Sequence, residues 1–172
     1  MTESRATVAR YLWLSVQTDT LPAAVAQRWA DDIIASEPHP TADIIEVAWS
    51  RKASDVVMAL GGVDGSNVLN GDPDFELAER WFLRTLHSQL RAGRAPADVL
   101  RAAKHVLRES SLDIDVYHVA LSLENDWLLA DSGIHGSTSK VTERIAKFLE
   151  GHAAESLPAE LEAVQRIIGT DE

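Results

Sequence analysis

Residues 77–110 read LAERWFLRTLHSQLRAGRAPADVLRAAKHVLRES, and two segments with helical periodicity meet here at one short turn. The basic residues recur at helical spacing in both segments. They are Arg80, Arg84, His87 and Arg91 in the first and Arg101, Lys104, His105 and Arg108 in the second. Because only a few residues around Gly93 and Pro96 separate the two segments, the stretch predicts an αα-hairpin. Each helix of the hairpin carries a basic stripe. The opposite, apolar face comprises Trp81, Phe82, Leu86, Leu90, Leu100, Ala103 and Leu107.

Charge is segregated along the chain. Residues 1–76 carry a net charge of −7, residues 77–110 carry +4 and residues 111–172 carry −8, which together give the net charge of −11. A strongly acidic protein does not attract nucleic acid or anionic lipid over its whole surface, because such binders normally present net positive charge. The composition therefore favours a basic partner.

Length and composition limit the class of protein. A chain of 172 residues is close to the size of one domain, and it buries roughly 70% of the surface that its unfolded form exposes. The absence of Cys excludes disulfides, thiolate nucleophiles and thiolate metal sites. No apolar run approaches the roughly 20 residues that span a bilayer. We expect one helical domain over residues 1–172, located in the cytoplasm and not in a membrane.

Apolar spacing and stop signals predict further helices outside the hairpin. The expected helices cover residues 2–17, 22–35, 41–50, 55–60 with Ser54 as the cap, 137–151 and 158–169. The first helix of the hairpin is expected to begin at Asp72 and Pro73. Residues 113–132 fit two patterns. Asp115, His118 and Ser122 favour a helix, whereas alternating apolar residues favour a small β-hairpin at about 116–131.

These elements predict an all-α fold, an irregular bundle of about seven to nine helices around the central αα-hairpin. The alternative is an α+β fold that contains the small hairpin at 116–131. The expected core is built around Leu12, Trp29, Ile33, Trp49, Trp81, Leu86, Leu100, Leu107, Leu121 and Leu149. The five Trp residues fall one to a segment, so most are expected to fill the core, and one that stays exposed could anchor a partner.

The sequence contains no complete catalytic or cofactor motif. The run from Gly133 to Lys140 fails as a phosphate loop, since Ser139 precedes the lysine and Val141 follows it. The acidic loop at residues 61–76 does not fit the EF-hand register. The six histidines form no metal-binding motif, and no Gly-x-Ser-x-Gly elbow is present. We therefore assign no metal, cofactor or catalytic residue.

Three explanations account for the basic stripes. They are the solvated faces of two helices, or they dock on the protein's own acidic segments, notably Glu155, Glu160 and Glu162, or they bind an anion. The candidate contact residues are Arg80, Arg84, His87, Arg91, Arg101, Lys104 and Arg108. The sequence leaves all three explanations open.

The preferred hypothesis is a non-enzymatic interaction protein, such as an inhibitor or immunity-type protein that neutralises a basic protein partner. Acidic surfaces steer such a partner and speed its encounter. One alternative is a nucleic-acid-associated or anion-binding regulator that uses the hairpin at 77–110, although the net charge makes nucleic acid a poor ligand. The other alternative is a small helical enzyme with an Asp/His site. Homo-oligomer formation stays open.

Overall fold

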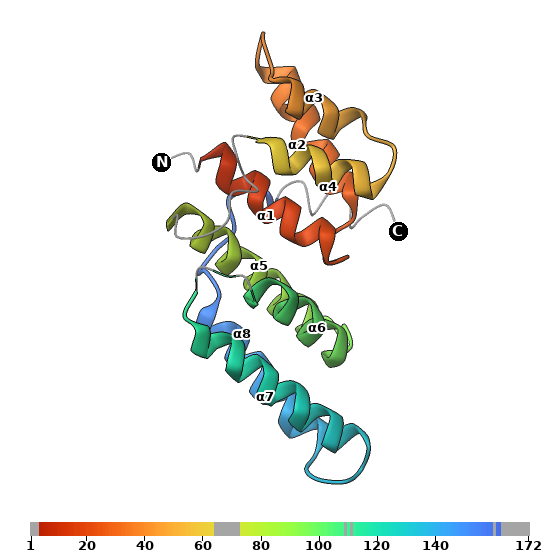
Figure 1. The fold of residues 1–172 in the computed structure, drawn as a ribbon, viewed down its shortest axis with the longest axis vertical. Helices are drawn as coiled ribbons and strands as arrows, with labels where there is room; N and C mark the ends of the chain where they lie inside the picture. The colour runs from red at the N-terminus through yellow and green to blue at the C-terminus, as the bar shows by residue number, and fades with distance from the viewer. Residues whose placement is uncertain (1–3, 64–72, 109, 111, 160, 163–172) are drawn as a thin grey trace. The chain divides into compact units, whose positions relative to one another are not determined.

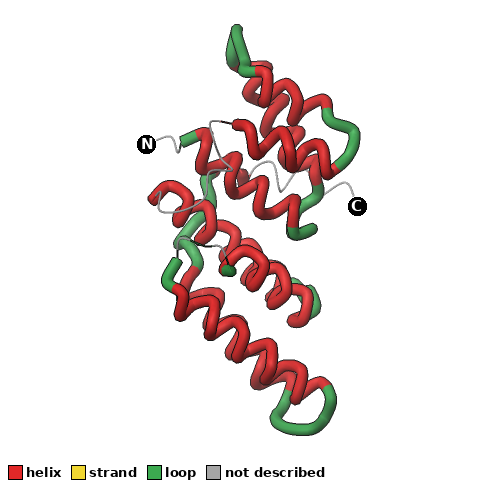
Figure 2. The backbone as a smooth tube through the Cα atoms, viewed as in Figure 1, coloured by secondary structure: helices red, strands yellow, loops and turns green. Residues whose placement is uncertain are grey.

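The computed structural model describes residues 4–63, 73–108, 110, 112–159 and 161–162. Across these residues the chain forms eight α-helices and no strand, as the backbone trace in Figure 2 shows. The prediction of an all-α fold is confirmed. Contacts among the helices divide the chain into two compact units, Met1–Leu69 with Ser156–Glu172 and Asn70–Glu155. We describe each unit by itself, and the expectation of a single domain stays a prediction.

Residues 4–63 of the first unit form four helices, which Figure 1 shows in red to yellow. They are α1 (Arg5–Gln17), α2 (Ala23–Ser36), α3 (Ala42–Trp49) and α4 (Ala53–Gly62). The Oγ atom of Ser4 accepts a hydrogen bond of 3.4 Å from the backbone N–H of Thr7, which caps the start of α1. Pro22 directly precedes α2, where its missing N–H costs no helical hydrogen bond.

Within this unit α3 packs against both α2 and α4, and α1 packs against α4. The side chains buried in the unit include Leu12, Val25, Trp29, Ile44, Val47, Val56 and Leu60. Gln27 of α2 donates a hydrogen bond of 2.6 Å to the backbone oxygen of Ser50, just beyond α3. The position of α3 is therefore fixed on two sides, by its neighbours α2 and α4.

The second unit contains α5 (Pro73–Arg91), α6 (Pro96–Leu107), α7 (Ile114–Asp131) and α8 (Thr138–His152). α5 and α7 each pack against α6 and α8, and α6 and α8 also contact each other. Gly93 turns the chain between α5 and α6 with a φ of 103°, a conformation that favours glycine. The two helices form the expected αα-hairpin. All the residues predicted for its apolar face are buried, namely Trp81, Phe82, Leu86, Leu90, Leu100, Ala103 and Leu107.

The ambiguous stretch at 113–132 is helical, so the α+β alternative with a hairpin at about 116–131 is wrong. Asp113 caps α7 by accepting a hydrogen bond of 3.0 Å from the backbone N–H of Asp115. The buried residues of α7 are Val116, Ala120, Leu123 and Ala130, which recur at helical spacing. The alternation that suggested a strand arises because this helix also carries apolar residues on its exposed side.

Two further predictions need correction, and a third falls largely outside the described residues. Trp49 was expected in the core, but its side chain is 78% exposed, and Ile33 and Leu121 are only half-buried. Ser54 does not cap α4, because that helix already begins at Ala53, and the Ser54 hydroxyl bonds to the Asp55 carboxylate instead. Of the helix expected at 158–169, the structure shows the start at Ala159, and residues 163–169 lie outside the described residues.

Among the helices that the structure describes, none combines the length and the apolar character needed to cross a bilayer.

The two tryptophans Trp81 and Trp49 should respond in opposite ways to truncation. Trp81→Ala removes a side chain that is 2% exposed, so the free energy of unfolding should fall by about 3–5 kcal/mol. Trp49→Ala should change it by less than about 0.5 kcal/mol. Urea denaturation followed by circular dichroism measures both values. Equal losses for the two variants would show that Trp49 is packed in the core.

Candidate functional site

Arg80 and Arg84 of the basic hairpin bind the carboxyl end of α8. The Nη1 atom of Arg80 donates a hydrogen bond of 3.3 Å to the backbone oxygen of His152, the last residue of that helix. Arg84 donates one of 3.2 Å to the backbone oxygen of Ala154, and the N–H of Ala154 donates one of 3.1 Å to the oxygen of Arg80. Because the last carbonyls of a helix lack helical partners, the two cations stabilise the end of α8.

The remaining nitrogens of Arg80 face Glu76, one turn earlier in α5. Nε and Nη2 lie 2.9 and 2.7 Å from the same carboxylate oxygen of Glu76. The guanidinium of Arg80 therefore bridges its own helix and the end of α8. All three nitrogens of the guanidinium therefore have a partner within the unit, while the side chain stays 36% exposed.

Other basic residues of the hairpin also pair with acids of the same unit. Arg91 lies 3.4 Å from Glu143 of α8, and Lys104 forms an ion pair with Glu124 of α7. Arg101 pairs with Asp98 at 2.9 Å on its own helix, and its side chain remains 76% exposed.

Arg108 and His87 complete the seven predicted contact residues. Arg108 also has an interaction partner. The Nε2 atom of His87 is buried and forms no hydrogen bond with the described residues. The role of the seven residues in contacting an anion or a partner stays a prediction.

The second explanation for the stripes, docking on acidic segments of the chain, describes two of these contacts, those of Arg91 and Lys104, whereas the pairs of Arg80 with Glu76 and of Arg101 with Asp98 are local pairs on one helix. The acidic partners differ from those expected, because Glu124 and Glu143 take part and Glu155 is exposed. Glu160 lies outside the described residues. The sequence could not identify Glu124 and Glu143, since they lie 20 and 52 positions away from their basic partners.

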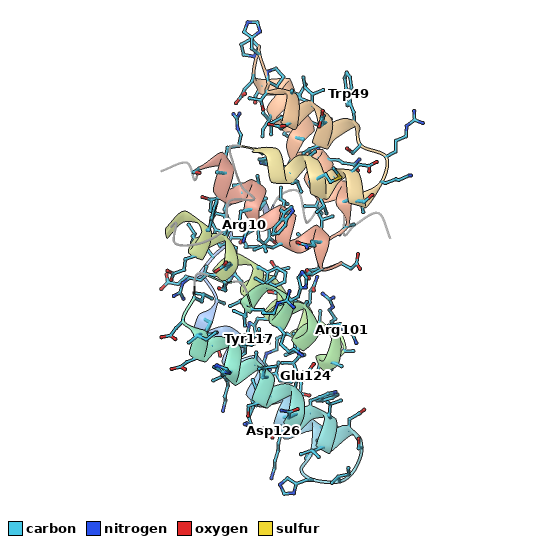
Figure 3. The ribbon with its side chains drawn as sticks, viewed as in Figure 1. Arg10, Trp49, Arg101, Tyr117, Glu124 and Asp126 are labelled. Atoms are coloured by element: carbon cyan, nitrogen blue, oxygen red, sulfur yellow. The ribbon has the colours of Figure 1, made fainter. Side chains whose placement is uncertain are left out.

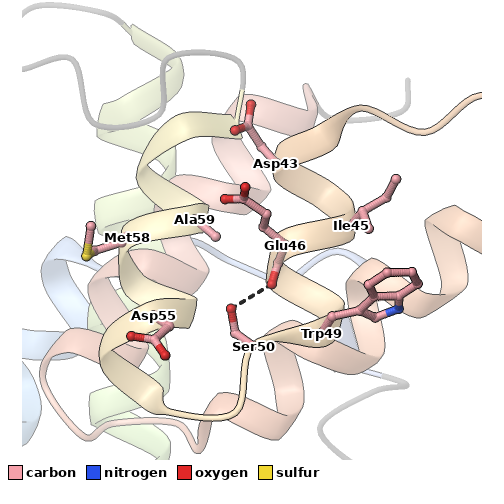
Figure 4. Close-up of a pocket in the computed structure, with 8 residues that line it drawn as sticks. All are labelled: Asp43, Ile45, Glu46, Trp49, Ser50, Asp55, Met58 and Ala59. Atoms are coloured by element: carbon pink, nitrogen blue, oxygen red, sulfur yellow. Dashed lines mark hydrogen bonds between the residues drawn. The ribbon is translucent and has the colours of Figure 1, made fainter.

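A groove of about 490 Å³ lies along α3 and α4 in the first unit. Its lining combines three carboxylates with four apolar side chains and one hydroxyl, from Asp43, Ile45, Glu46, Trp49, Ser50, Asp55, Met58 and Ala59. Figure 4 shows Glu46 and Ser50 between the two helices, with Trp49 on the side of α3 and Met58 on the side of α4. Polar side chains therefore lie toward the space between the helices, and the large apolar side chains of Trp49 and Met58 lie on its two outer sides.

Trp49 and Met58 are the most exposed large apolar residues in the described part of the chain, at 78% and 79%. Trp49 projects outward from α3 in Figure 3. An exposed tryptophan is uncommon on a free surface and frequent where proteins bind each other, because a large ring supplies much contact area. Sequence reasoning allowed that one tryptophan could stay exposed, but it placed Trp49 in the core.

The carboxylates of the groove differ from the bases of the hairpin in their pairing. Among the residues that the structure describes, Asp43, Glu46 and Asp55 form no ion pair. The nearest cations in the sequence, Arg51 and Lys52, are exposed in the turn between α3 and α4. The groove is therefore a negatively charged surface whose carboxylates form no ion pair with the described residues of the unit.

A smaller hollow of about 250 Å³ lies at the turn between α7 and α8. It contains His135, Lys140 and Ser137, which are all exposed, and Asp126, which accepts a hydrogen bond of 2.7 Å from Arg144. An acid–base pair needs the histidine and the carboxylate within hydrogen-bond reach, whereas Asp126 is engaged by an arginine. This hollow gives little support to an Asp/His enzyme.

The described residues contain no group of three His, Asp or Glu side chains that could hold a metal ion. Asp115 and His118, which share a helix face, are both exposed on α7. Most of the acidic loop at 61–76 lies outside the described residues.

A scan against protein-family models and searches of curated proteins and of solved structures find no match to this chain.

The contacts of Arg80 predict a structural role that can be measured. Arg80→Ala removes the bridge to Glu76 and the bond to the end of α8, so the free energy of unfolding should fall by about 1 kcal/mol. Arg101→Ala, which removes an exposed pair, should change it by less than about 0.5 kcal/mol. Chemical denaturation compares the two variants. No difference between them would mean that the bridge adds no stability.

His152 predicts a dependence of stability on pH. Burial, and secondarily the charge of Arg80, lower the pKa of His152 below its usual 6.5. The unfolded state therefore binds the proton more readily, so the stability contribution is intact above pH 6.5 and declines as the pH falls toward the lower folded pKa. Between pH 7.5 and 5.5, His152→Gln should lose less stability than the parent protein. Identical losses in urea titrations would contradict this assignment.

Proposed function

We propose that this chain is a non-enzymatic interaction protein that binds a basic protein partner through the groove between α3 and α4. The observation that carries the proposal is the exposure of Trp49 and Met58 beside three carboxylates that form no ion pair with any residue that the structure describes. A role as an inhibitor or immunity-type protein, which neutralises a basic partner, fits this chemistry. The net charge of −11 supports the choice of a basic partner.

The two parts of the groove perform different tasks in such a complex. Unpaired carboxylates at a surface attract a cationic protein over a distance of about one Debye length, ~8–10 Å, and raise the rate of encounter. Apolar side chains then supply affinity when water leaves the contact, and tryptophan is enriched among the residues that contribute most. The groove combines both kinds of group within two short helices.

A regulator that binds nucleic acid or another anion through the hairpin at 77–110 is the second candidate. It requires basic side chains that are free to contact phosphate. Arg101, at 76% exposure, is the best placed of them, but Arg80 and Arg84 are engaged by the end of α8. The observed contacts therefore favour the acidic groove as the contact surface.

The proposal predicts the effect of truncating the groove. The double variant Trp49→Ala/Met58→Ala should weaken binding to the basic partner that copurifies from the native cell by about 30-fold or more, because both apolar anchors are lost. Isothermal titration calorimetry at 0.15 M salt measures the affinity. Leu128→Ala, an exposed apolar residue on α7 at 54%, is the matched control and should bind normally.

Two results would refute the proposal. One is an unchanged affinity in the double variant, and the other is the recovery of no basic protein partner. Loss of nucleic-acid binding in Arg84→Ala and Arg101→Ala, measured at low salt, would instead support the second candidate.

A further inference from the structure

The side of α7 opposite to its buried residues carries a row of apolar and polar side chains. The buried side, which packs against α6 and α8, is marked by Val116, Ala120 and Leu123. On the opposite side, five residues follow one another at steps of three or four positions and so form one row, which we call the α7 row: Ile114, His118, Leu121, Asn125 and Leu129. Ile114 is 59% exposed and Leu129 is 39% exposed, whereas Leu121 is half-buried.

The middle of α7 presents little charge to an outside molecule. Its two acids, Glu124 and Asp126, are half-buried and pair with Lys104 and Arg144 of the neighbouring helices. All of α7 lies within the described residues, so the exposed middle of this helix contains no unpaired carboxylate. In a chain with a net charge of −11, such a face allows a second acidic molecule to approach without strong repulsion.

The α7 row has the same pattern when it is followed from either end. Apolar residues stand at its ends and its centre, and the polar residues His118 and Asn125 stand between them. When a second copy lies antiparallel, Ile114 of each copy meets Leu129 of the other, and His118 meets Asn125. The two Leu121 side chains then meet near the two-fold axis. The row is therefore self-complementary, as a two-fold symmetric interface requires.

The two ends of α7 carry groups of opposite charge on the same side of the helix. Asp115 is exposed near the start, and Asp126 and Leu129 lie 11 and 14 positions further on, about three and four turns. These two residues line the hollow that also contains the exposed His135 and Lys140. Neither Asp115 nor Lys140 forms an ion pair with the described residues. Because like sides meet around a two-fold axis, antiparallel copies bring each Asp115 to the other copy's Lys140.

We propose that a second copy of this chain packs on the α7 row, with the two α7 helices antiparallel about a two-fold axis near Leu121. This inference does not depend on the proposed function, because the groove belongs to the other unit. One helix face is small beside the roughly 800 Å² that each partner contributes to a standard interface, so the dimer should be weak, with a dissociation constant of about 100 µM.

Sedimentation equilibrium of the full chain, from about 5 µM to about 500 µM at about 0.15 M salt, measures the dissociation constant. Leu121→Glu brings two carboxylates together near the axis and should weaken the dimer at least about tenfold. Ser88→Glu adds the same charge at an exposed position on α5 and should leave the dimer unchanged. Circular dichroism checks that both variants keep the helical content of the parent protein.

An exchange of charges tests the antiparallel arrangement. Asp115→Lys and Lys140→Asp should each weaken the dimer about fivefold, because each places like charges at both ends of the interface. The double variant Asp115→Lys/Lys140→Asp should recover the affinity of the parent protein, since the pairs form again with their charges reversed. This recovery requires folded protein and therefore separates a lost contact from a folding defect.

Three results would overturn the proposal. They are a monomer at every concentration, a dimer that persists unchanged in Leu121→Glu, and a double variant that stays as weak as the two single variants. The last result would show that the start of α7 does not lie beside the second copy's α7–α8 turn.

Discussion

The contact between α5 and the end of α8 engages two of the basic side chains of the hairpin. Arg80 and Arg84 donate to the last backbone oxygens of α8 and its following segment, and Ala154 donates back to the oxygen of Arg80. Helix ends need such partners, because their final carbonyls have none within the helix. Part of the basic stripe is therefore engaged within one unit, where Arg80 and Arg84 complement the negative end of α8, while the side chain of Arg101 stays 76% exposed.

The acidic residues at the groove of α3 and α4 differ from Arg80 and Arg84, because they form no ion pair with the described residues. Asp43, Glu46 and Asp55 stand at a groove without a cation of their own among the described residues, next to the exposed Trp49. A free protein gains nothing from this arrangement, since exposed carboxylates repel one another and an exposed indole is poorly hydrated. A basic partner with an apolar side chain would reduce the repulsion between the carboxylates and would remove the indole from water. The physical contrast between paired bases and unpaired acids supports the acidic groove as the binding surface.

Sequence reasoning predicted the helices and the hairpin because these depend on local signals, such as the Gly93–Pro96 turn and the spacing around Leu86 and Leu100. It failed for Trp49 because α3 is apolar on more than one side, and only the packing of α2 and α4 selects Ile44 and Val47 for burial. It also missed the acidic partners of the stripes, since ion pairs such as Arg91–Glu143 join distant parts of the chain. Local pattern thus indicates helices, while the choice of face requires the tertiary structure.

Hydrogen–deuterium exchange of the complex with the native basic partner tests the central claim most directly. Exchange slows where a partner covers the surface or reduces local opening of the backbone. The account predicts slower exchange on binding in residues 42–62, which form α3 and α4, and little change in residues 73–108. Protection centred on α5 and α6 with none in residues 42–62 would contradict it, because the partner would then contact the basic hairpin.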